Sequence, residues 1–171
     1  MMGYWKDPVA TQQRIVEGWL QTGDVGEFCS NGALRILGRL DDVIVLQNGR
    51  KVDPLPLELQ IQGDPLFRRA ILAGYGREFV VAIVVIDGDR WNKVISKEPI
   101  SDLKRLEARL LERIAERLRE SPRYAIPRRV FWLMHDLRLE LGEVTAKGTV
   151  RRQVFLESME KELSKLYSEP T

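Results

Sequence analysis

Residues 38–54, GRLDDVIVLQNGRKVDP, decide the fold of this 171-residue chain. The apolar run VIVL lies between an acidic doublet and an Asn-Gly pair, and two basic residues follow. Asn-Gly between apolar runs is a strong short-range signal for a β-hairpin with a two-residue turn. The stretch therefore predicts a hairpin in which residues 43–46 form one strand, Asn48 and Gly49 the turn, and residues 50–53 the returning strand.

The residues that follow this hairpin predict a compact α+β domain. Residues 54–61, PLPLELQI, fit two structures. Their alternating leucines favour a strand, whereas prolines in the first turn favour a short helix, which is the preferred interpretation. After a strand predicted within RRAILAGYG, residues 79–86 are almost continuously apolar, which is typical of a strand covered on both faces.

Two later segments have a helical period. Residues 101–120 form the clearest predicted helix, and Ser101 is suited to its N-cap. The charged side chains of this helix are expected to pair with one another locally. Its apolar stripe consists of Leu103, Leu106, Leu110, Ile114 and Leu118. Residues 128–134 predict another strand, and residues 150–167 predict a last helix.

The first 37 residues differ from the rest of the chain. Short apolar runs separated by Gly, Asn and Ser indicate strands and turns. Their apolar side chains are too few for an independent core. Residues 1–37 are therefore interpreted as the end of a larger domain.

The composition excludes several classes of protein. A net charge of +2 favours no particular partner, and no run approaches the roughly 18–20 apolar residues of a membrane span. A single cysteine, Cys29, cannot form an internal disulfide, which favours the cytoplasm. With one histidine, His135, the chain lacks the residues for a His/Cys metal site. No nucleophile motif is near His135, so we expect its role to be structural.

Five motifs in order resemble the second half of adenylate-forming enzymes, the superfamily of acyl-CoA synthetases, peptide-synthetase adenylation domains and luciferase. DDVIVLQNGRKVDP most resembles the long-chain acyl-CoA synthetase branch. The motifs are MMGYWKDPVAT, GWLQTGDVG, LRILGRLDDVIVLQNGRKVDPLPLE, SPRYAIPRRV and TAKGTVRR. The resemblance implies that residues 1–40 end the large AMP-binding domain and that residues 41–171 form the small C-terminal domain, a mobile lid.

The resemblance also implies the chemistry. The family makes an acyl-adenylate from a carboxylate, such as a fatty acid, and ATP, and many members then transfer the acyl group to coenzyme A or a carrier-protein thiol. The phosphate-binding loop, the Mg²⁺ carboxylate and the acyl pocket would belong to the missing N-terminal domain. The chain alone is then expected to be inactive, and its first residues could drive self-association.

Three residues are assigned to the nucleotide and the hinge. By resemblance, Asp24 in TGD binds the ribose and Arg39 contacts it, because a carboxylate accepts from a diol and a guanidinium donates to oxygens. Asp41 matches the hinge at which the small domain rotates. Without the resemblance, Asp24 would be a turn residue and Arg39 a surface arginine.

Gly49 and Arg50 lie at the predicted hairpin tip. The resemblance places this loop along the channel for the thiol carrier, where a glycine allows close approach of the backbone to a ligand. A plain Asn-Gly turn explains Gly49 equally well.

TAKGTVRR departs from the family pattern. The family places a lysine directly after the loop glycine, where its charge stabilises the adenylation transition state. Here Thr149 follows Gly148, and Lys147 precedes it. Lys147 is the candidate catalytic residue, and a shift of the loop would bring it to the position of the family lysine. The alternative is that this protein adenylates poorly.

Two further interpretations stay open. Thr149 favours a non-catalytic binding module that retains the small-domain fold. A cluster of seven basic residues between 121 and 153 could hold coenzyme A phosphates or be a solvated face, and no recognised motif supports nucleic-acid binding. The seven are Arg123, Arg128, Arg129, Arg138, Lys147, Arg151 and Arg152.

Overall fold

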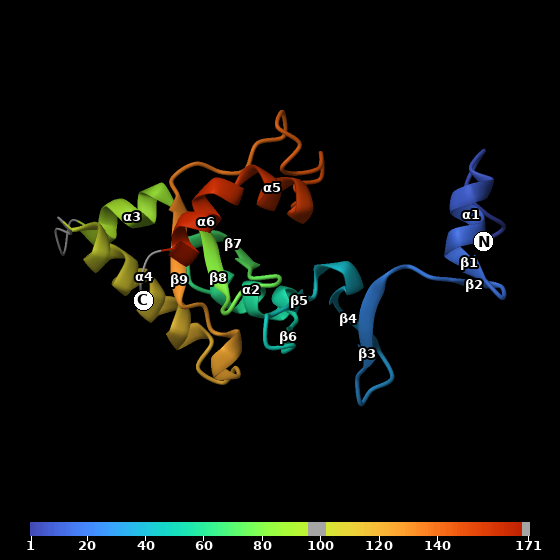
Figure 1. Ribbon diagram of the computed structural model, residues 1–171, viewed down its shortest axis with the longest axis horizontal. Helices are drawn as coiled ribbons and strands as arrows, with labels where there is room; N and C mark the ends of the chain where they lie inside the picture. Colours follow the sequence, from blue (N-terminus) through green and yellow to red (C-terminus); the bar gives the residue numbers. More distant parts are fainter. Residues whose placement is uncertain (96–101, 169–171) are drawn as a thin grey trace. The chain divides into compact units, whose positions relative to one another are not determined.

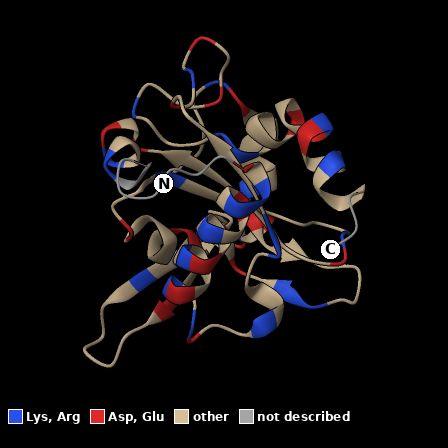
Figure 2. Ribbon diagram, turned by 90° about the vertical axis from the view of Figure 1, so that its left-hand side faces the viewer, with Lys and Arg blue, Asp and Glu red and all other residues tan. Residues whose placement is uncertain are grey.

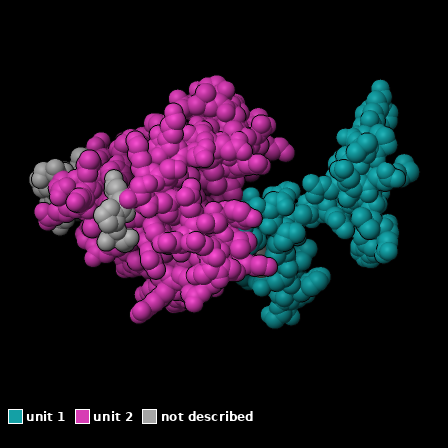
Figure 3. Space-filling model, in the orientation of Figure 1, with its two compact units in different colours: residues 1–43 teal, residues 44–171 magenta. Residues whose placement is uncertain are grey.

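The computed structural model describes residues 1–95 and 102–168 of the chain. These residues form two compact units, Met1–Val43 (unit 1) and Ile44–Thr171 (unit 2), coloured separately in Figure 3. Ser101, predicted as an N-cap, lies outside the described residues.

Unit 1 contains two antiparallel pairs of strands and a short helix that the sequence did not predict. The helix α1 begins at Pro8, and the side chain of Asp7 accepts a hydrogen bond from the backbone N–H of Ala10 at 2.9 Å. The prediction of strands and turns alone is therefore wrong for these residues, although the hairpin β3–β4 is confirmed. The elements are α1 (Pro8–Arg14), β1 (Ile15–Val16), β2 (Trp19–Leu20), β3 (Asp24–Phe28), β4 (Leu34–Arg39) and the 3-10 helix η1 (Leu40–Asp42).

The apolar side chains of unit 1 do not form a core. Among its described side chains, no hydrophobic residue is buried, and Trp5, Trp19 and Phe28 are each about four-fifths exposed or more, at 88%, 79% and 81%. A small unit without buried apolar area has little to offset the entropy of ordering its backbone.

Unit 2 opens with the predicted hairpin, β5 (Ile44–Val45) and β6 (Lys51–Val52), in which Ile44 pairs with Val52. The turn is one residue longer than predicted, because the N–H of Leu46 donates to the carbonyl of Arg50 at 2.9 Å and residues 47–49 form the loop. Gly49 ends this three-residue loop with a φ of +79°, the left-handed conformation that such loops require. The next element is the helix α2 (Pro54–Gln62), so the helical interpretation of these residues is confirmed. It buries Leu57 and Ile61 against the core.

A three-stranded sheet lies at the centre of unit 2, in the order β7 (Phe67–Ala73), β8 (Val81–Ile86) and β9 (Arg129–Leu133). β8 pairs antiparallel with β7 and parallel with β9. All six residues of β8 are buried, which confirms the strand covered on both faces.

The two faces of β8 belong to different hydrophobic clusters. Ala82, Val84 and Ile86 pack with residues of α2 and α4 (Leu103–Arg117), whereas Ile83 and Val85 pack with Phe155. Figure 1 shows helices on both sides of the sheet. Alternation along one strand therefore supplies both halves of the core.

The helix α4 confirms most of its predicted stripe, because Leu106, Leu110, Ile114 and Leu118 are buried. Leu103 is 72% exposed, so its assignment to the stripe is wrong. Asp102 is the N-cap and accepts from the backbone N–H of Lys104 at 3.0 Å.

Two other helices differ from the prediction. The helix α3 (Gly88–Ile95) was not predicted. The last helix, predicted as one, is two, α5 (Arg152–Ser158) and α6 (Glu160–Ser168). The break lies at Met159, whose backbone departs from helical geometry at ψ 8°. A short 3-10 helix, η2 (Arg123–Ala125), precedes β9.

Candidate functional site

Asp24 and Arg39 face each other in unit 1, where the register of β3 and β4 makes them direct partners. Arg39 Nη1 lies 3.8 Å from Asp24 Oδ1, and both side chains are partly exposed. The backbone N–H of Asp24 donates to Thr22 Oγ1 at 3.1 Å, which fixes the turn that presents the carboxylate. The structure thus brings the two predicted nucleotide-binding residues together.

A second arginine, which no sequence motif predicts, approaches the same turn. Gly23 has a φ of +76°, and a Cβ there would lie 3.4 Å from Arg39 Nη2 and 3.6 Å from Arg14 Nη1. Arg14 ends α1, nine residues before the glycine. Two guanidinium groups and one carboxylate therefore surround a bare backbone position, a set of groups that can bind hydroxyls and anionic oxygens together.

Asp41 lies in η1, and its side chain is exposed. Two residues later, between Val43 and Ile44, the chain passes from unit 1 to unit 2. The predicted hinge residue therefore lies in a short helical turn next to the boundary between the units.

Gly49 and Arg50 lie at the exposed tip of the hairpin β5–β6. A Cβ on Gly49 would meet nothing within 4 Å, so its positive φ, and not crowding, favours glycine there. The Arg50 guanidinium lies 4.8 Å from the ring centroid of Tyr124, within cation–π range. Asn48 Oδ1 accepts from the backbone N–H of Arg50 at 3.1 Å, which rigidifies the tip.

Lys147 and Thr149 lie in the loop 144–150, which is itself a tight hairpin. Val144 bridges Val150, and the N–H of Thr145 donates to the carbonyl of Thr149 at 2.8 Å. Gly148 has a φ of +78°, as in three-residue hairpin loops that end in a left-handed residue. Both Lys147 and Thr149 are exposed, so each can reach a ligand.

The base of this loop is anchored in the core of unit 2. Arg152 Nη2 donates to Glu58 Oε2 at 2.6 Å, and Arg152 Nη1 donates to the carbonyl of Leu72 at 2.8 Å. Glu58 is buried and also accepts from the N–H of Leu72 at 2.7 Å. These contacts give Glu58 a structural role, because it joins α2, β7 and the base of the loop.

The predicted residues of unit 2 lie in two segments that are apart from each other. The hairpin β5–β6 and the segment before α5, which carries loop 144–150, lie apart in Figure 1. The hairpin tip presents Gly49 and Arg50, and the loop presents Lys147.

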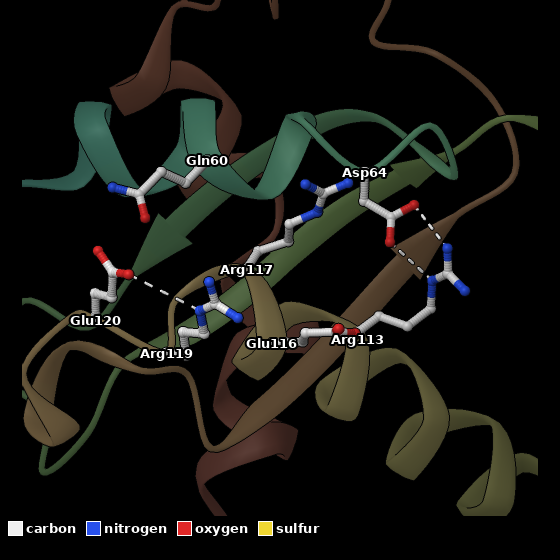
Figure 4. A pocket seen from close by; sticks show the side chains of 7 residues that line it. All are labelled: Gln60, Asp64, Arg113, Glu116, Arg117, Arg119 and Glu120. Carbon is white, nitrogen blue, oxygen red and sulfur yellow. Dashed lines mark hydrogen bonds and ion pairs between the residues drawn. The ribbon is translucent and has the colours of Figure 1, made fainter.

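A polar cleft of about 520 Å³ in unit 2 contains none of the predicted residues. Figure 4 shows the bidentate pair at its edge, in which Arg113 donates to Asp64 at 2.8 and 2.9 Å. Burial alone would raise the pKa of Asp64, but hydrogen bonds from Arg113 and the Leu66 N–H outweigh it and lower the pKa. Three acids and three arginines line the cleft, so its charge does not favour an anion. The lining residues are Gln60, Asp64, Arg113, Glu116, Arg117, Arg119 and Glu120.

The charges of α4 do not all pair within the helix, contrary to the prediction. Arg109 pairs with Glu112 at 2.8 Å, but Arg113 pairs with Asp64 and Glu107 with Arg129 of β9, at 2.6 Å. Figure 2 shows acidic and basic residues interspersed on the ribbon. Arg129 and Arg152, two members of the predicted basic cluster, are thus in partly buried ion pairs.

The remaining candidates are His135, a metal site and a membrane span. His135 is exposed just after β9, and its Nδ1 lies 3.3 Å from the carbonyl of Asp136. Within residues 1–95 and 102–168, no group of three or more His, Cys, Asp or Glu residues could hold a metal ion. None of the helices in these ranges has the length and apolarity to cross a membrane.

Comparison with known proteins identifies the family. The model of the AMP-binding enzyme C-terminal domain matches residues 41–171. The chain belongs to the AMP-binding enzyme family. The resemblance to adenylate-forming enzymes and the α+β fold of their C-terminal part are thereby confirmed.

The relatives of this AMP-binding chain are longer. The long-chain-fatty-acid–CoA ligase FadD15 of Mycobacterium tuberculosis is 29% identical over 176 residues, which cover 97% of this chain and 29% of the ligase. The long-chain-fatty-acid–CoA ligase ACSBG1 of Bos taurus is 37% identical over half of this chain and 12% of its own length. The chain therefore spans less than a third of these relatives.

Solved structures of similar fold include adenylation domains. The adenylation domain of a carboxylate reductase from Mycobacterium chelonae has a TM-score of 0.85 at 25% identity and covers 98% of this chain and 26% of that one. ATP-bound MatB from Rhodopseudomonas palustris has a TM-score of 0.65 at 26% identity, over 94% of this chain and 28% of MatB.

Proposed function

We propose that this chain is the C-terminal part of an ATP-dependent acyl-CoA ligase, which adenylates a carboxylate and then forms a thioester with coenzyme A. The observation that carries the proposal is the similarity to FadD15 along 97% of the chain, together with the family match over residues 41–171. Residues 1–40 would end the large AMP-binding domain, and residues 41–171 would be the small lid domain.

In the proposed reaction, unit 1 contributes to the nucleotide site. The Asp24 carboxylate would accept from the two ribose hydroxyls, and Arg39 would donate to the same sugar. Their 3.8 Å separation and partial exposure leave both groups free to exchange their mutual contact for ligand contacts. Asp41 would act as the hinge, since a few backbone torsions between two units can carry a large rotation.

Lys147 would supply positive charge to the α-phosphate and the substrate carboxylate during adenylation. A preorganised cation stabilises the charge that develops in such a transition state. The exposed hairpin tip, Gly49 and Arg50, would instead line the channel for the thiol carrier. Because the hairpin β5–β6 and loop 144–150 lie apart in unit 2, each half-reaction would use a different part of the lid.

The cofactors of the proposed ligase are ATP, its product AMP and coenzyme A, and MatB is a neighbour solved with ATP. Mg²⁺ would be held by the large N-terminal domain, which also would provide the acyl pocket. A fatty acid is the proposed carboxylate, with free coenzyme A or a carrier-protein thiol as acceptor. We place the enzyme in the cytoplasm and expect the isolated chain to self-associate through the exposed apolar side chains of unit 1.

A non-catalytic binding module is the second candidate. Thr149 supports it, because a threonine hydroxyl carries no charge with which to replace the family lysine. This module would keep the fold and the nucleotide contacts of Asp24 and Arg39 but would not adenylate.

Pyrophosphate exchange into ATP tests the proposal. The chain alone, given ATP, Mg²⁺ and a long-chain fatty acid, should show no exchange, because half of the site lies outside it. A fusion in which this chain replaces its matching region of FadD15 (the FadD15 fusion) should restore exchange. Robust exchange by the chain alone would contradict the divided site, and a folded, ATP-binding fusion without exchange would establish the non-catalytic module.

A further inference from the structure

Arg69 of β7 links two segments that are distant in the sequence. Its Nε donates to Asp136 Oδ1 at 2.6 Å, and its Nη1 donates to the carbonyl of Gly148 at 3.1 Å. The side chain is 26% exposed. One planar guanidinium thus holds the residue after Lys147 while its own orientation is fixed by a carboxylate.

Asp136 is in turn held in place. Its Oδ1 accepts from the backbone N–H of Leu137 at 2.8 Å, in addition to the Arg69 bond. Burial alone would raise the pKa of Asp136, but these hydrogen bonds and the nearby arginine charges outweigh it and lower the pKa. The carboxylate is therefore ionised near neutral pH, when it holds Arg69 by a charge-assisted bond.

The contacts of Arg69 with Asp136 and with Gly148, here called the clamp, act on the tip of loop 144–150, residues 145–149. Arg152 acts on the base of the loop. Within the tip, the N–H of Gly148 donates to the carbonyl of Thr145 at 2.8 Å, and the N–H of Thr149 donates to Thr145 Oγ1 at 3.2 Å. These local bonds lie within the turn and do not connect its tip to the sheet. The bond from Arg69 to Gly148 does connect the tip to the sheet, because Arg69 belongs to β7.

We propose that Arg69, oriented by Asp136, is a positioning residue that aims the tip of loop 144–150, and with it Lys147, during adenylation. This inference rests on the proposed function, since Lys147 is the group being aimed. A charged side chain on an unclamped tip must be ordered in each transition state, and that ordering lowers the rate. Thioester formation, which would use the hairpin β5–β6, should not depend on the clamp.

Arg69→Met tests the inference against a matched control, Arg68→Met. Arg68 precedes Arg69 in β7 but is 54% exposed and reaches Asp136 only at 4.0 Å and Asp87 at 3.5 Å. Both substitutions remove one arginine charge, and only the first removes the contact with Gly148. Asp136→Asn is a second variant, which weakens the clamp without touching the loop.

The first measurement is amide hydrogen exchange in the unfused chain. Arg69→Met and Asp136→Asn should accelerate exchange at the Gly148 and Thr149 amides by about tenfold, because a tip that Arg69 no longer holds opens its bonds to Thr145 more often. Exchange in β8, which reports any loss of global stability, should accelerate less than exchange at Gly148 and Thr149 in both variants, and Arg68→Met should leave the loop at parental rates. Parental exchange at Gly148 in Arg69→Met would overturn the clamp.

The second measurement separates the half-reactions in the FadD15 fusion. Arg69→Met should lower acyl-adenylate formation by about tenfold, while the conversion of supplied acyl-adenylate to acyl-CoA stays within about twofold. Equal losses in both half-reactions, or none, would overturn the positioning role. An inactive parental fusion would instead refute the proposed function, and the exchange measurement would still decide the clamp.

Discussion

Units 1 and 2 differ in what holds them together. Unit 2 buries hydrophobic side chains on both faces of a three-stranded sheet, with helices on each side. Unit 1 buries none among its described side chains, although it contains several large apolar residues. Both units have hairpins with glycines in the left-handed region, so turn chemistry alone does not make a stable domain.

This difference is consistent with the division of the proposed ligase into a large domain and a lid. A lid that rotates must keep its own core through the motion, whereas the end of a large domain can rely on that domain for cover. The pair proposed to bind the nucleotide, Asp24 and Arg39, lies in the unit without a core, and Lys147 lies in the unit with one. Matched substitutions in the two units test this contrast.

The largest expected effect is the difference between two phenylalanine truncations, one in each unit. Phe155 is 1% exposed in unit 2, and Phe28 is 81% exposed in unit 1. Phe155→Ala should lower the free energy of unfolding by about 3–5 kcal/mol because it leaves a cavity in a close-packed core. Urea denaturation of the chain measures the change.

Phe28→Ala is the matched control and should change the free energy of unfolding by less than about 0.5 kcal/mol. It should also reduce binding of a hydrophobic dye, because it removes exposed apolar area. A loss of several kcal/mol in Phe28→Ala would show that unit 1 has a core after all.

A smaller effect is expected from two aspartate–arginine pairs. Asp64→Asn in unit 2 should lower the free energy of unfolding by about 1.5–3 kcal/mol at neutral pH, the usual range for hydrogen bonds to charged groups. Asp24→Asn in unit 1 should lower it by at most about 1 kcal/mol, because Asp24 and Arg39 are partly exposed and 3.8 Å apart.

The pH dependence of Asp64→Asn follows from the lowered pKa of Asp64 in the folded state. Its stabilisation is present above the unfolded pKa, about 3.9, and is lost as the pH falls through the lower folded pKa. The parental chain and Asp64→Asn should therefore differ most near neutral pH and converge below about pH 4. Urea titrations at about pH 7, 5 and 3, two above the unfolded pKa of Asp64 and one below it, would detect the convergence. A difference that does not change with pH would contradict it.

The sequence predicted those parts of the fold whose burial leaves a periodic pattern. β8 and most of α4 were found because their apolar positions follow the strand and helix periods. The helix α1 was missed because it buries none of its residues and leaves no amphipathic stripe. The break at Met159 was missed because it lies within a continuous helical period and is marked by neither Gly nor Pro.

The candidate site was predictable only as separate motifs. Asp24 and Arg39 are brought together by the register of one hairpin, a local feature. Arg14 and the pair formed by Arg69 and Asp136 depend on contacts across the fold, 67 residues apart in the second case. No short pattern encodes such a contact, because any exposed arginine and aspartate would look the same.

Half-reaction assays of Lys147→Ala and Thr149→Ala in the FadD15 fusion test the central claim most directly, that Lys147 takes the place of the family lysine. Lys147→Ala should lower acyl-adenylate formation by about 10²–10³-fold, the usual effect of removing a group that stabilises transition-state charge. It should leave thioester formation from supplied acyl-adenylate nearly unchanged, and Thr149→Ala should alter neither step. Full adenylation by Lys147→Ala would contradict the account.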